Sequence, residues 1–299
     1  MAPEDGAGLQ PDQRTVADLH CYLVPRGRVE SPPPLTCDSL DPDLDWIDAL
    51  LTLAAMAAIV AAGFVAGAIN TIVGSGSLIT FPTLLALGYP PVVANVSNTV
   101  GLVFGSVGGV FGYRRELAGQ GRRLLWLAVP TATGAIVGAY LLLVLPQRVF
   151  KNVVPVLIAI AIVLVLVQPW LSRRVDHPSG GGPTRKALLA AGTFGTAVYG
   201  GYFGAAQGVI LMSVLMILVD DSLQRLNALK NVFAAVVNGI AAVYFVLVAS
   251  VAWEPAILIA VSSVVGSQVG ALAGRRLSPL VLRGVIVAAG AVGLVKLLT

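Results

Sequence analysis

Charged residues are scarce in this chain: they make up 11% of its 299 residues, whereas 57% are hydrophobic. Soluble domains carry about 25% charged residues, so this scarcity excludes an ordinary soluble fold. Apolar runs of about 20 residues, the length of a membrane-spanning helix, recur from Ala49 to the C-terminus. Polar and apolar residues do not alternate in these runs as they do in a membrane β-barrel. The sequence therefore predicts an all-α, polytopic membrane protein.

Cysteine and histidine are also scarce, with two of each. Cys21, Cys37 and His20 fall in the N-terminal tail and His177 in a polar loop, and their spacing matches no metal site. No Ser–His–Asp arrangement is evident, and the glycine-rich "GSGS" (74–77) lacks the lysine of a nucleotide-binding loop. We therefore expect no enzyme activity, no cofactor and no metal site.

The distribution of polar residues divides the chain into four parts. Residues 1–45 are rich in Pro, Asp and Arg, which predicts a disordered tail, and they lack the apolar core of a signal peptide. Residues 46–171 are assigned to a first transmembrane repeat, 172–186 to a polar, glycine-rich cytoplasmic linker, and 187–299 to a second transmembrane repeat. The predicted apolar segments are 47–69, 72–88, 92–113, 124–145, 150–171, 187–203, 205–219, 226–250, 255–273 and 279–298.

The two halves of the chain resemble each other when one is shifted along the other. A single constant shift makes these positions coincide: Gly134 and Gly266, Gly138 and Gly270, Asn95 and Asn227, Asn98 and Lys230. With a slightly shorter shift, "GSGSLI" (74–79) meets "GAAQGV" (204–209). Similar offsets over several segments predict an internal duplication, in which each repeat holds a pair of short segments and three longer spans.

Basic residues predict the orientation of the repeats, because Lys and Arg accumulate in cytoplasmic loops. Loop 113–123 and the linker are basic, whereas 251–254 contains no base. Segment 187–219 must then enter and leave the membrane on the cytoplasmic side as a broken hairpin, and 47–88 does the same from outside. A hairpin and three crossings per repeat invert the second repeat relative to the first, as in many secondary transporters. Both termini are predicted to lie outside.

The two hairpins carry much of the candidate site. A broken helix frees backbone N–H groups and helix N-termini, which attract anions, and glycines allow a ligand to approach the backbone. Such backbone is tolerated at membrane depth where it is buried in protein or lines a cavity. The candidate substrate-binding residues in the hairpins are Asn70, Ser75, Gly76, Ser77, Gly204, Gln207 and Gly208. The alternative is that these glycines only permit tight packing between helices.

The span after each hairpin adds further polar residues to the candidate site. These residues are Asn95, Asn98 and Thr99 in the first repeat, and Asn227, Lys230 and Asn231 in the second. Lys230 is an ionisable residue inside a span, which is a functional hypothesis by default and here predicts an anion ligand. The alternative is snorkelling, because Lys230 lies only about a turn and a half beyond Arg225, near the cytoplasmic interface.

Long stretches of the chain resemble a known family. "GAINTIVGSGSLITFPTLLALGYPPVVANVSNTVGLVFGSVGGVFGYRREL" resembles the first-repeat signature of the TauE/SafE sulfite-exporter family, and "GYFGAAQGVILMSVL" followed by "LNALKNVFAAVVN" resembles its second repeat. The resemblance covers roughly residues 47–298, and the chain departs from the usual glycine-rich pattern at Ser75 and Ser77. It implies a permease of the bacterial plasma membrane for sulfur-containing anions such as sulfite or organosulfonates.

Residues and resemblance together predict a secondary transporter of a small oxyanion, working by alternating access at a midplane site between the two hairpins. An anion channel on the same scaffold is the alternative, because broken helices and inverted repeats also occur in channels. The expected partners are a small anionic substrate and the lipid bilayer, with a homodimer left open. Nucleic acid is not expected, because the net charge of +4 sits in short loops between spans.

Overall fold

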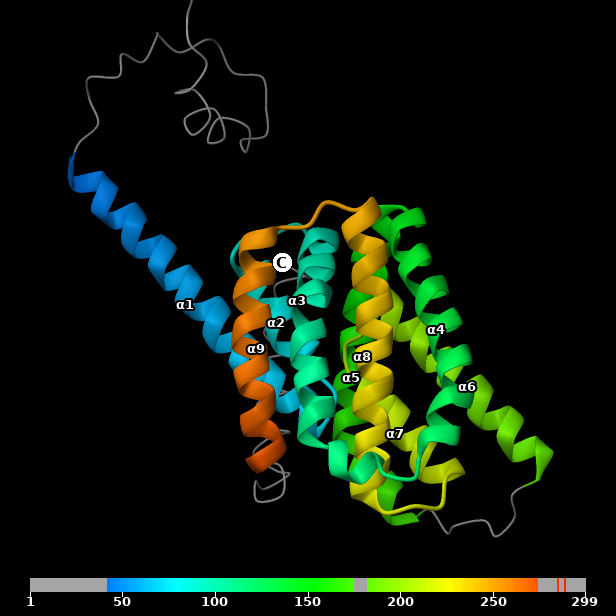
Figure 1. Cartoon of the computed structure of the whole chain (residues 1–299). Helices are drawn as coiled ribbons and strands as arrows, with labels where there is room; N and C mark the ends of the chain where they lie inside the picture. The colour runs from blue at the N-terminus through cyan, green and yellow to red at the C-terminus, as the bar shows by residue number, and fades with distance from the viewer. Residues whose placement is uncertain (1–41, 175–181, 274–283, 285–287, 289–299) are drawn as a thin grey trace, which may run out of the picture. The chain divides into compact units, whose positions relative to one another are not determined.

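The computed structural model describes residues 42–174, 182–273, 284 and 288. These residues form helices and turns, and no strand occurs in the ranges described. The helices are α1 (Pro42–Ile72), α2 (Ser77–Ala86), α3 (Pro91–Gly112), η2 (Arg114–Leu117), α4 (Gly121–Val144), α5 (Gln147–Arg174), α6 (Pro183–Tyr202), α7 (Gln207–Leu218), α8 (Leu223–Val248) and α9 (Trp253–Ala273), drawn in Figure 1. The structure confirms the prediction of an all-α fold.

Five of the described helices, α1, α3, α4, α8 and α9, are long and apolar enough to cross a membrane by length and composition. Helices α2 and α7 are apolar but have only 10 and 12 residues. Each therefore covers only about half of a bilayer, since a spanning helix needs about 20 residues. This combination of long and short apolar helices confirms the multi-pass prediction.

The predicted boundaries of the tail and the linker differ from the helix ends. Helix α1 begins at Pro42, inside the predicted tail, and the chain divides into an N-terminal unit up to Trp46 and a larger unit from Ile47 onward. Helix α5 runs to Arg174 and α6 starts at Pro183, so helix extends into the predicted linker from both sides. The last predicted segment, 279–298, lies largely outside the described residues.

Helices α1 and α6 end through the same backbone geometry. The N–H of Gly74 donates to the carbonyl of Ile69 at 3.1 Å, and the N–H of Gly204 donates to that of Tyr199 at 3.2 Å. Gly74 has φ +88° and Gly204 has φ +75°, a left-handed conformation that glycine adopts at little energetic cost. The shift that aligns the two glycine-rich stretches also aligns both donors and both acceptors, so the chain breaks at equivalent places in the two predicted repeats.

The segment 183–218 turns back on itself. The Arg185 side chain, at the start of α6, donates from Nε to the carbonyl of Leu218, at the end of α7, at 2.8 Å. The first turn of α6 and the last turn of α7 therefore lie together at one end of the bundle, as the prediction of a hairpin requires.

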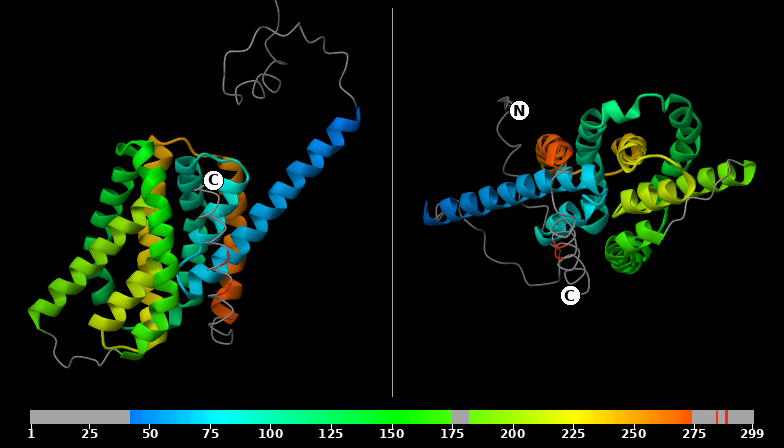
Figure 2. Two further views of the ribbon diagram at one scale, coloured as in Figure 1. Left: turned by 180° about the vertical axis from the view of Figure 1, so that it is seen from behind. Right: turned by 90° about the horizontal axis from the view of Figure 1, so that it is seen from below.

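Close packing at glycines joins α1 to α9 and α4 to α6. A Cβ added to Gly266 would overlap the carbonyl of Phe64, and one added to Gly134 would meet that of Phe194 at 2.5 Å. These contacts, and the packing of α9 on α3 and of α4 on α8, define two groups of helices within the larger unit, which meet where α3 packs on α8. The right-hand view of Figure 2 looks along α8 and α9, with α1 and α6 lying across it. Gly134 and Gly266 therefore permit the close approach of neighbouring helices.

Candidate functional site

The two helix breaks meet in the interior, as predicted. The N–H of Gly208, in the first turn of α7, donates to the carbonyl of Gly74 at 2.9 Å. A Cβ on either glycine would overlap the Cα of the other. Two segments from opposite halves of the chain are thus held together by their main chains, and only glycine fits at the contact.

The N-terminal ends of α2 and α7 lie on either side of this contact. Neither helix has a side-chain hydrogen bond at its N-cap, which is Gly76 for α2 and Ala206 for α7. Ala206 has φ +58°, a conformation that a residue with a Cβ seldom adopts. Most first-turn N–H groups of both helices already donate to backbone carbonyls, so the two ends suit an anion chiefly through the positive ends of their helix dipoles.

Unpartnered polar atoms are buried beside the two breaks. Ser75 Oγ, Gln207 Nε2 and Asn95 Oδ1 have no hydrogen-bond partner within the described residues. The Ser75 side chain is fully buried, and Gln207 is 4% exposed. Most buried polar groups in proteins are satisfied, so orphaned groups at a predicted site require an explanation. A hydroxyl and an amide N–H₂ can both donate to the oxygen atoms of an anion.

Lys230 binds the C-terminal end of α1. Its Nζ donates to the carbonyls of Asn70 and Thr71, at 3.2 Å each, and the side chain is fully buried. Asn227 and Asn231 donate from Nδ2 to the same Thr71 carbonyl, at 3.4 and 3.2 Å. These three residues of α8 therefore satisfy carbonyls that a helix leaves open at its C-terminus. The snorkelling alternative is wrong, because the ammonium group does not reach the surface.

The asparagines of α3 have related contacts. Asn95, the equivalent of Asn227, donates from Nδ2 to the carbonyl of Tyr202, at the end of α6, at 3.0 Å. Asn98, the equivalent of Lys230, is fully buried, donates to Ser77 Oγ at 3.2 Å and accepts from the Thr80 hydroxyl. Asn98 therefore holds the start of α2 and not the end of α6.

Thr99 was predicted to bind substrate, but its hydroxyl is already hydrogen-bonded within α3. A contact between α3 and α8, made by Ser106 and Asn238, was not predicted. The Thr99 hydroxyl donates to the Asn95 carbonyl at 2.9 Å, so it is engaged by the backbone of α3. The predicted site includes neither Ser106 nor Asn238. The Ser106 hydroxyl accepts from Asn238 Nδ2 at 2.9 Å and from Asn70 Nδ2 at 3.1 Å. Ser106 and Asn238 are 132 residues apart, so they occupy equivalent positions in the two predicted repeats.

Charged groups form a network at the end of the bundle where α4 and α8 begin. Asp221 pairs with Arg123 at 2.9 Å and with Arg225 at 2.8 Å. Burial by itself raises the pKa of the Asp221 carboxyl. The hydrogen bonds from Arg123 and the Ser222 N–H, together with the charges of Arg225 and Arg123, outweigh burial and hold that pKa below its ordinary value of 3.8. This network joins the first turn of α4 to the loop before α8 and to the first turn of α8.

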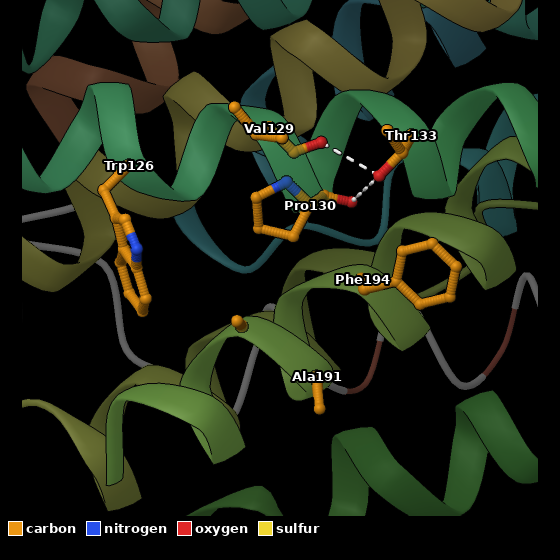
Figure 3. A pocket seen from close by; sticks show the side chains of 7 residues that line it. Trp126, Val129, Pro130, Thr133, Ala191 and Phe194 are labelled. Atoms are coloured by element: carbon orange, nitrogen blue, oxygen red, sulfur yellow. Dashed lines mark hydrogen bonds between the residues drawn. The ribbon is translucent and has the colours of Figure 1, made fainter. Parts of the chain in front are cut away.

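The described residues hold no candidate metal site, but a cavity lies away from the two breaks. In the part of the chain that the structure describes, no group of three or more His, Cys, Asp or Glu side chains could hold a metal ion. A cavity of about 580 Å³ lies between α4 and α6, with Trp126, Pro130 and Phe194 in its largely apolar lining (Figure 3). It shares no residue with the candidate site.

The family model described as sulfite exporter TauE/SafE matches residues 59–297. The chain belongs to the TauE/SafE family. It is 30% identical over 210 residues to the probable membrane transporter protein ORF9 of a Sinorhizobium species, which covers 70% of this chain and 79% of the relative. It is 27% identical over 234 residues to the probable membrane transporter protein YfcA of Escherichia coli K12, covering 78% and 86%.

A probable membrane transporter protein of Haemophilus influenzae is 27% identical over 215 residues, covering 70% of this chain and 81% of the relative. No solved structure matches the chain. The resemblance seen in the sequence is confirmed, and the protein is a membrane transporter of the TauE/SafE family.

Proposed function

We propose that this TauE/SafE protein is a secondary transporter of a small sulfur-containing oxyanion, such as sulfite or an organosulfonate. The observation that carries the proposal is the meeting of two helix breaks at Gly74 and Gly208, with unpartnered donors on Ser75 and Gln207 buried beside it. The description of the family as sulfite exporters supports the class of substrate.

Recognition in this proposal comes mainly from neutral donors. The side chains of Ser75 and Gln207 bind the oxygen atoms of the anion, and the positive dipole ends of α2 and α7 stabilise its charge. Preorganised N–H and O–H groups in a site without water stabilise a negative charge more strongly than they do at a surface. Lys230 provides positive charge nearby, and its hydrogen bonds to the Asn70 and Thr71 carbonyls hold the C-terminal end of α1 in place.

Transport proceeds by alternating access between the two groups of helices. In the described conformation Ser75, Asn98 and Lys230 are fully buried, which corresponds to an enclosed site. Movement of one group relative to the other, about the contact of Ser106 with Asn238, exposes the site to one side and then to the other. The proposed inversion of the repeats makes the two open states structurally similar.

The proposed location is the bacterial plasma membrane, with loop 113–123 in the cytoplasm and both termini outside. The four arginines of this loop support that orientation. The chain has two cysteines, Cys21 and Cys37, both in the tail. They should react with a membrane-impermeant maleimide in intact cells; labelling that requires permeabilised cells would contradict the orientation.

Uptake of radiolabelled sulfite into proteoliposomes tests the function. We expect saturable uptake that organosulfonates inhibit and that protein-free liposomes lack. Flux that rises without saturation, together with an ohmic current, would support the anion channel instead. If neither flux nor current appears, this chain has another substrate.

A further inference from the structure

A second cavity, which unlike the first is partly polar, lies where α3 and α9 end. It has a volume of about 470 Å³, and its lining includes Arg114, Arg115, Glu116, Gln268, Phe111 and Leu272. None of these residues belongs to the candidate transport site. The cavity is therefore separate from the candidate transport site.

Among the residues that the structure describes, no salt bridge neutralises the two arginines of this cavity. Arg114 and Arg115 are exposed, and the salt bridges among the residues that the structure describes involve Arg123 and Arg225 instead. Two arginines therefore stand against the single carboxylate of Glu116 in the lining. A guanidinium group without a carboxylate partner is suited to bind phosphate.

The remaining wall of the cavity is apolar and belongs to helices that can span a membrane. Phe111 is 60% exposed at the end of α3, and Leu272 is 78% exposed at the end of α9. Gln268 is held in place by its Nε2, which donates to the carbonyl of Gly108 at 2.9 Å. The cavity thus combines a basic side toward the loop with an apolar side toward the membrane, which matches a lipid with an anionic headgroup.

The predicted duplication provides a comparison. The shift that aligns the packing glycines of the two halves places Arg114 on Val246, Arg115 on Leu247 and Ile136 on Gln268. Leu247 is 77% exposed and Ile136 is 51% exposed, so the corresponding corner is apolar on its surface. The fold therefore does not require basic residues at this corner.

We propose that this cavity binds the headgroup of an anionic phospholipid, with the phosphate between Arg114 and Arg115 and an acyl chain along Phe111 and Leu272. This binding site is distinct from the transport site and does not depend on the nature of the transported anion.

Lipid titrations on the full chain, purified in detergent, test this proposal. Phosphatidylglycerol binding is followed by native mass spectrometry and by melting temperature, with phosphatidylcholine and inorganic phosphate in parallel. We expect phosphatidylglycerol to bind more tightly than phosphatidylcholine. The double variant Arg114→Gln/Arg115→Gln should weaken its binding about 25-fold, because each basic residue near an anionic headgroup contributes about fivefold.

Arg122→Gln is the matched control. Arg122 is an exposed arginine in the first turn of α4, close in sequence to Arg114 and Arg115, and it does not line the cavity. Arg122→Gln should bind phosphatidylglycerol like the wild type. The double variant should have the wild-type melting temperature in phosphatidylcholine, which would show that the double variant folds. The proposal would be overturned if Arg122→Gln lost as much phosphatidylglycerol binding as the double variant, or if the double variant bound phosphatidylglycerol fully. It would also be overturned if inorganic phosphate competed with phosphatidylglycerol at equal concentration.

Discussion

Lys230 has two separable properties, a positive charge and a set of hydrogen-bond donors. An ionised side chain at membrane depth is expensive to bury unless it is paired or bonded to carbonyls. Its Nζ is bonded to the carbonyls of Asn70 and Thr71, where the C-terminal dipole of α1 is negative. The same residue can therefore brace two helices and provide charge for an anion, and substitutions can separate these roles.

We predict different results for two substitutions at Lys230. Lys230→Gln keeps an N–H donor for the α1 carbonyls and removes the charge, whereas Lys230→Met removes both. The methionine variant should lose about 2 kcal/mol more stability than the glutamine variant, because it leaves buried carbonyls unsatisfied. Thermal unfolding in detergent measures this difference, and sulfite uptake measures the role of the charge. Equal stability of the two variants would contradict the capping role.

Ser75→Ala separates binding from stability at a second residue. The Ser75 hydroxyl is buried without a partner among the described residues, so its removal should leave the melting temperature unchanged or slightly higher. The same change should raise KM for sulfite about fivefold, as expected for the loss of one hydrogen bond to a substrate. Ser213→Ala is the control, because the Ser213 hydroxyl donates to the Val209 carbonyl of its own helix at 2.9 Å. A KM unchanged in Ser75→Ala would remove Ser75 from the site.

At the residue scale, sequence predicts which side chains are polar but not which backbone groups they meet. Asn70, Ser75, Gln207 and Lys230 could be selected because polar residues are rare in apolar spans. The Thr71 carbonyl, which accepts from three residues of α8, could not be selected, since every residue has a carbonyl. Its role depends on which helix end faces α8.

Among the elements, the two helix breaks are the most specific features. Gly74 and Gly88 have nearly the same backbone, with φ +88° and +89°, but only Gly74 has a close neighbour, Gly208. Gly88→Ala should therefore destabilise the protein by about 1 kcal/mol, from the left-handed backbone alone. Gly74→Ala should lose about 2 kcal/mol more, because its Cβ overlaps Gly208.

Thermal unfolding and sulfite uptake of these two alanine variants measure the contribution of the contact. Gly88→Ala should keep sulfite uptake, whereas Gly74→Ala should lose it even at temperatures where the variant remains folded. If the two variants behave alike, the contact between the breaks is unimportant for transport.

The network at Asp221 links the first turns of α4 and α8, and its contribution to stability depends on pH. The folded-state pKa of Asp221 is lower than its ordinary value, so its contribution is present at neutral pH and is lost as pH falls below about 4, toward the folded-state pKa. Asp221→Asn should cost about 1 kcal/mol at pH 7, since the partners are partly exposed to solvent, and this difference should vanish in acid.

Asp220→Asn is the control for this network. Asp220 is an exposed neighbour, and the described ion pairs involve Asp221. Its substitution should leave the melting temperature unchanged across the same pH range. A stability difference for Asp221→Asn that persists at low pH would show that something other than the carboxylate charge is lost.

Element boundaries follow from sequence where apolar runs and glycines set them. The breaks at 74 and 204 coincide with glycine-rich stretches, and the predicted spans match α3, α4, α8 and α9 within a few residues. The predicted linker is too long because helix extends into polar sequence. Arg173 and Arg174 are good helix formers, and Pro183 suits the first turn of α6.

At the scale of the whole molecule, the two groups of helices combine segments from both predicted repeats. Helix α9 packs on α1 and α3, α4 packs on α6 and α8, and the two groups meet where α8 packs on α3. The sequence offset indicates which segments are equivalent but not which ones are in contact. The mixing of segments from both repeats within each group therefore could not be predicted. The equivalent contacts at Gly134 and Gly266 support the duplication, and the inversion of the repeats stays a prediction.

Sulfite exchange in proteoliposomes tests the central claim most directly. Vesicles containing the full chain are loaded with radiolabelled sulfite, and its release is followed with and without unlabelled sulfite outside. A site open to one side at a time predicts that external sulfite accelerates release and that the effect saturates. Ser75→Ala should shift the saturating concentration upward. Release that is indifferent to external sulfite and proportional to the gradient would contradict alternating access at a site between the two breaks.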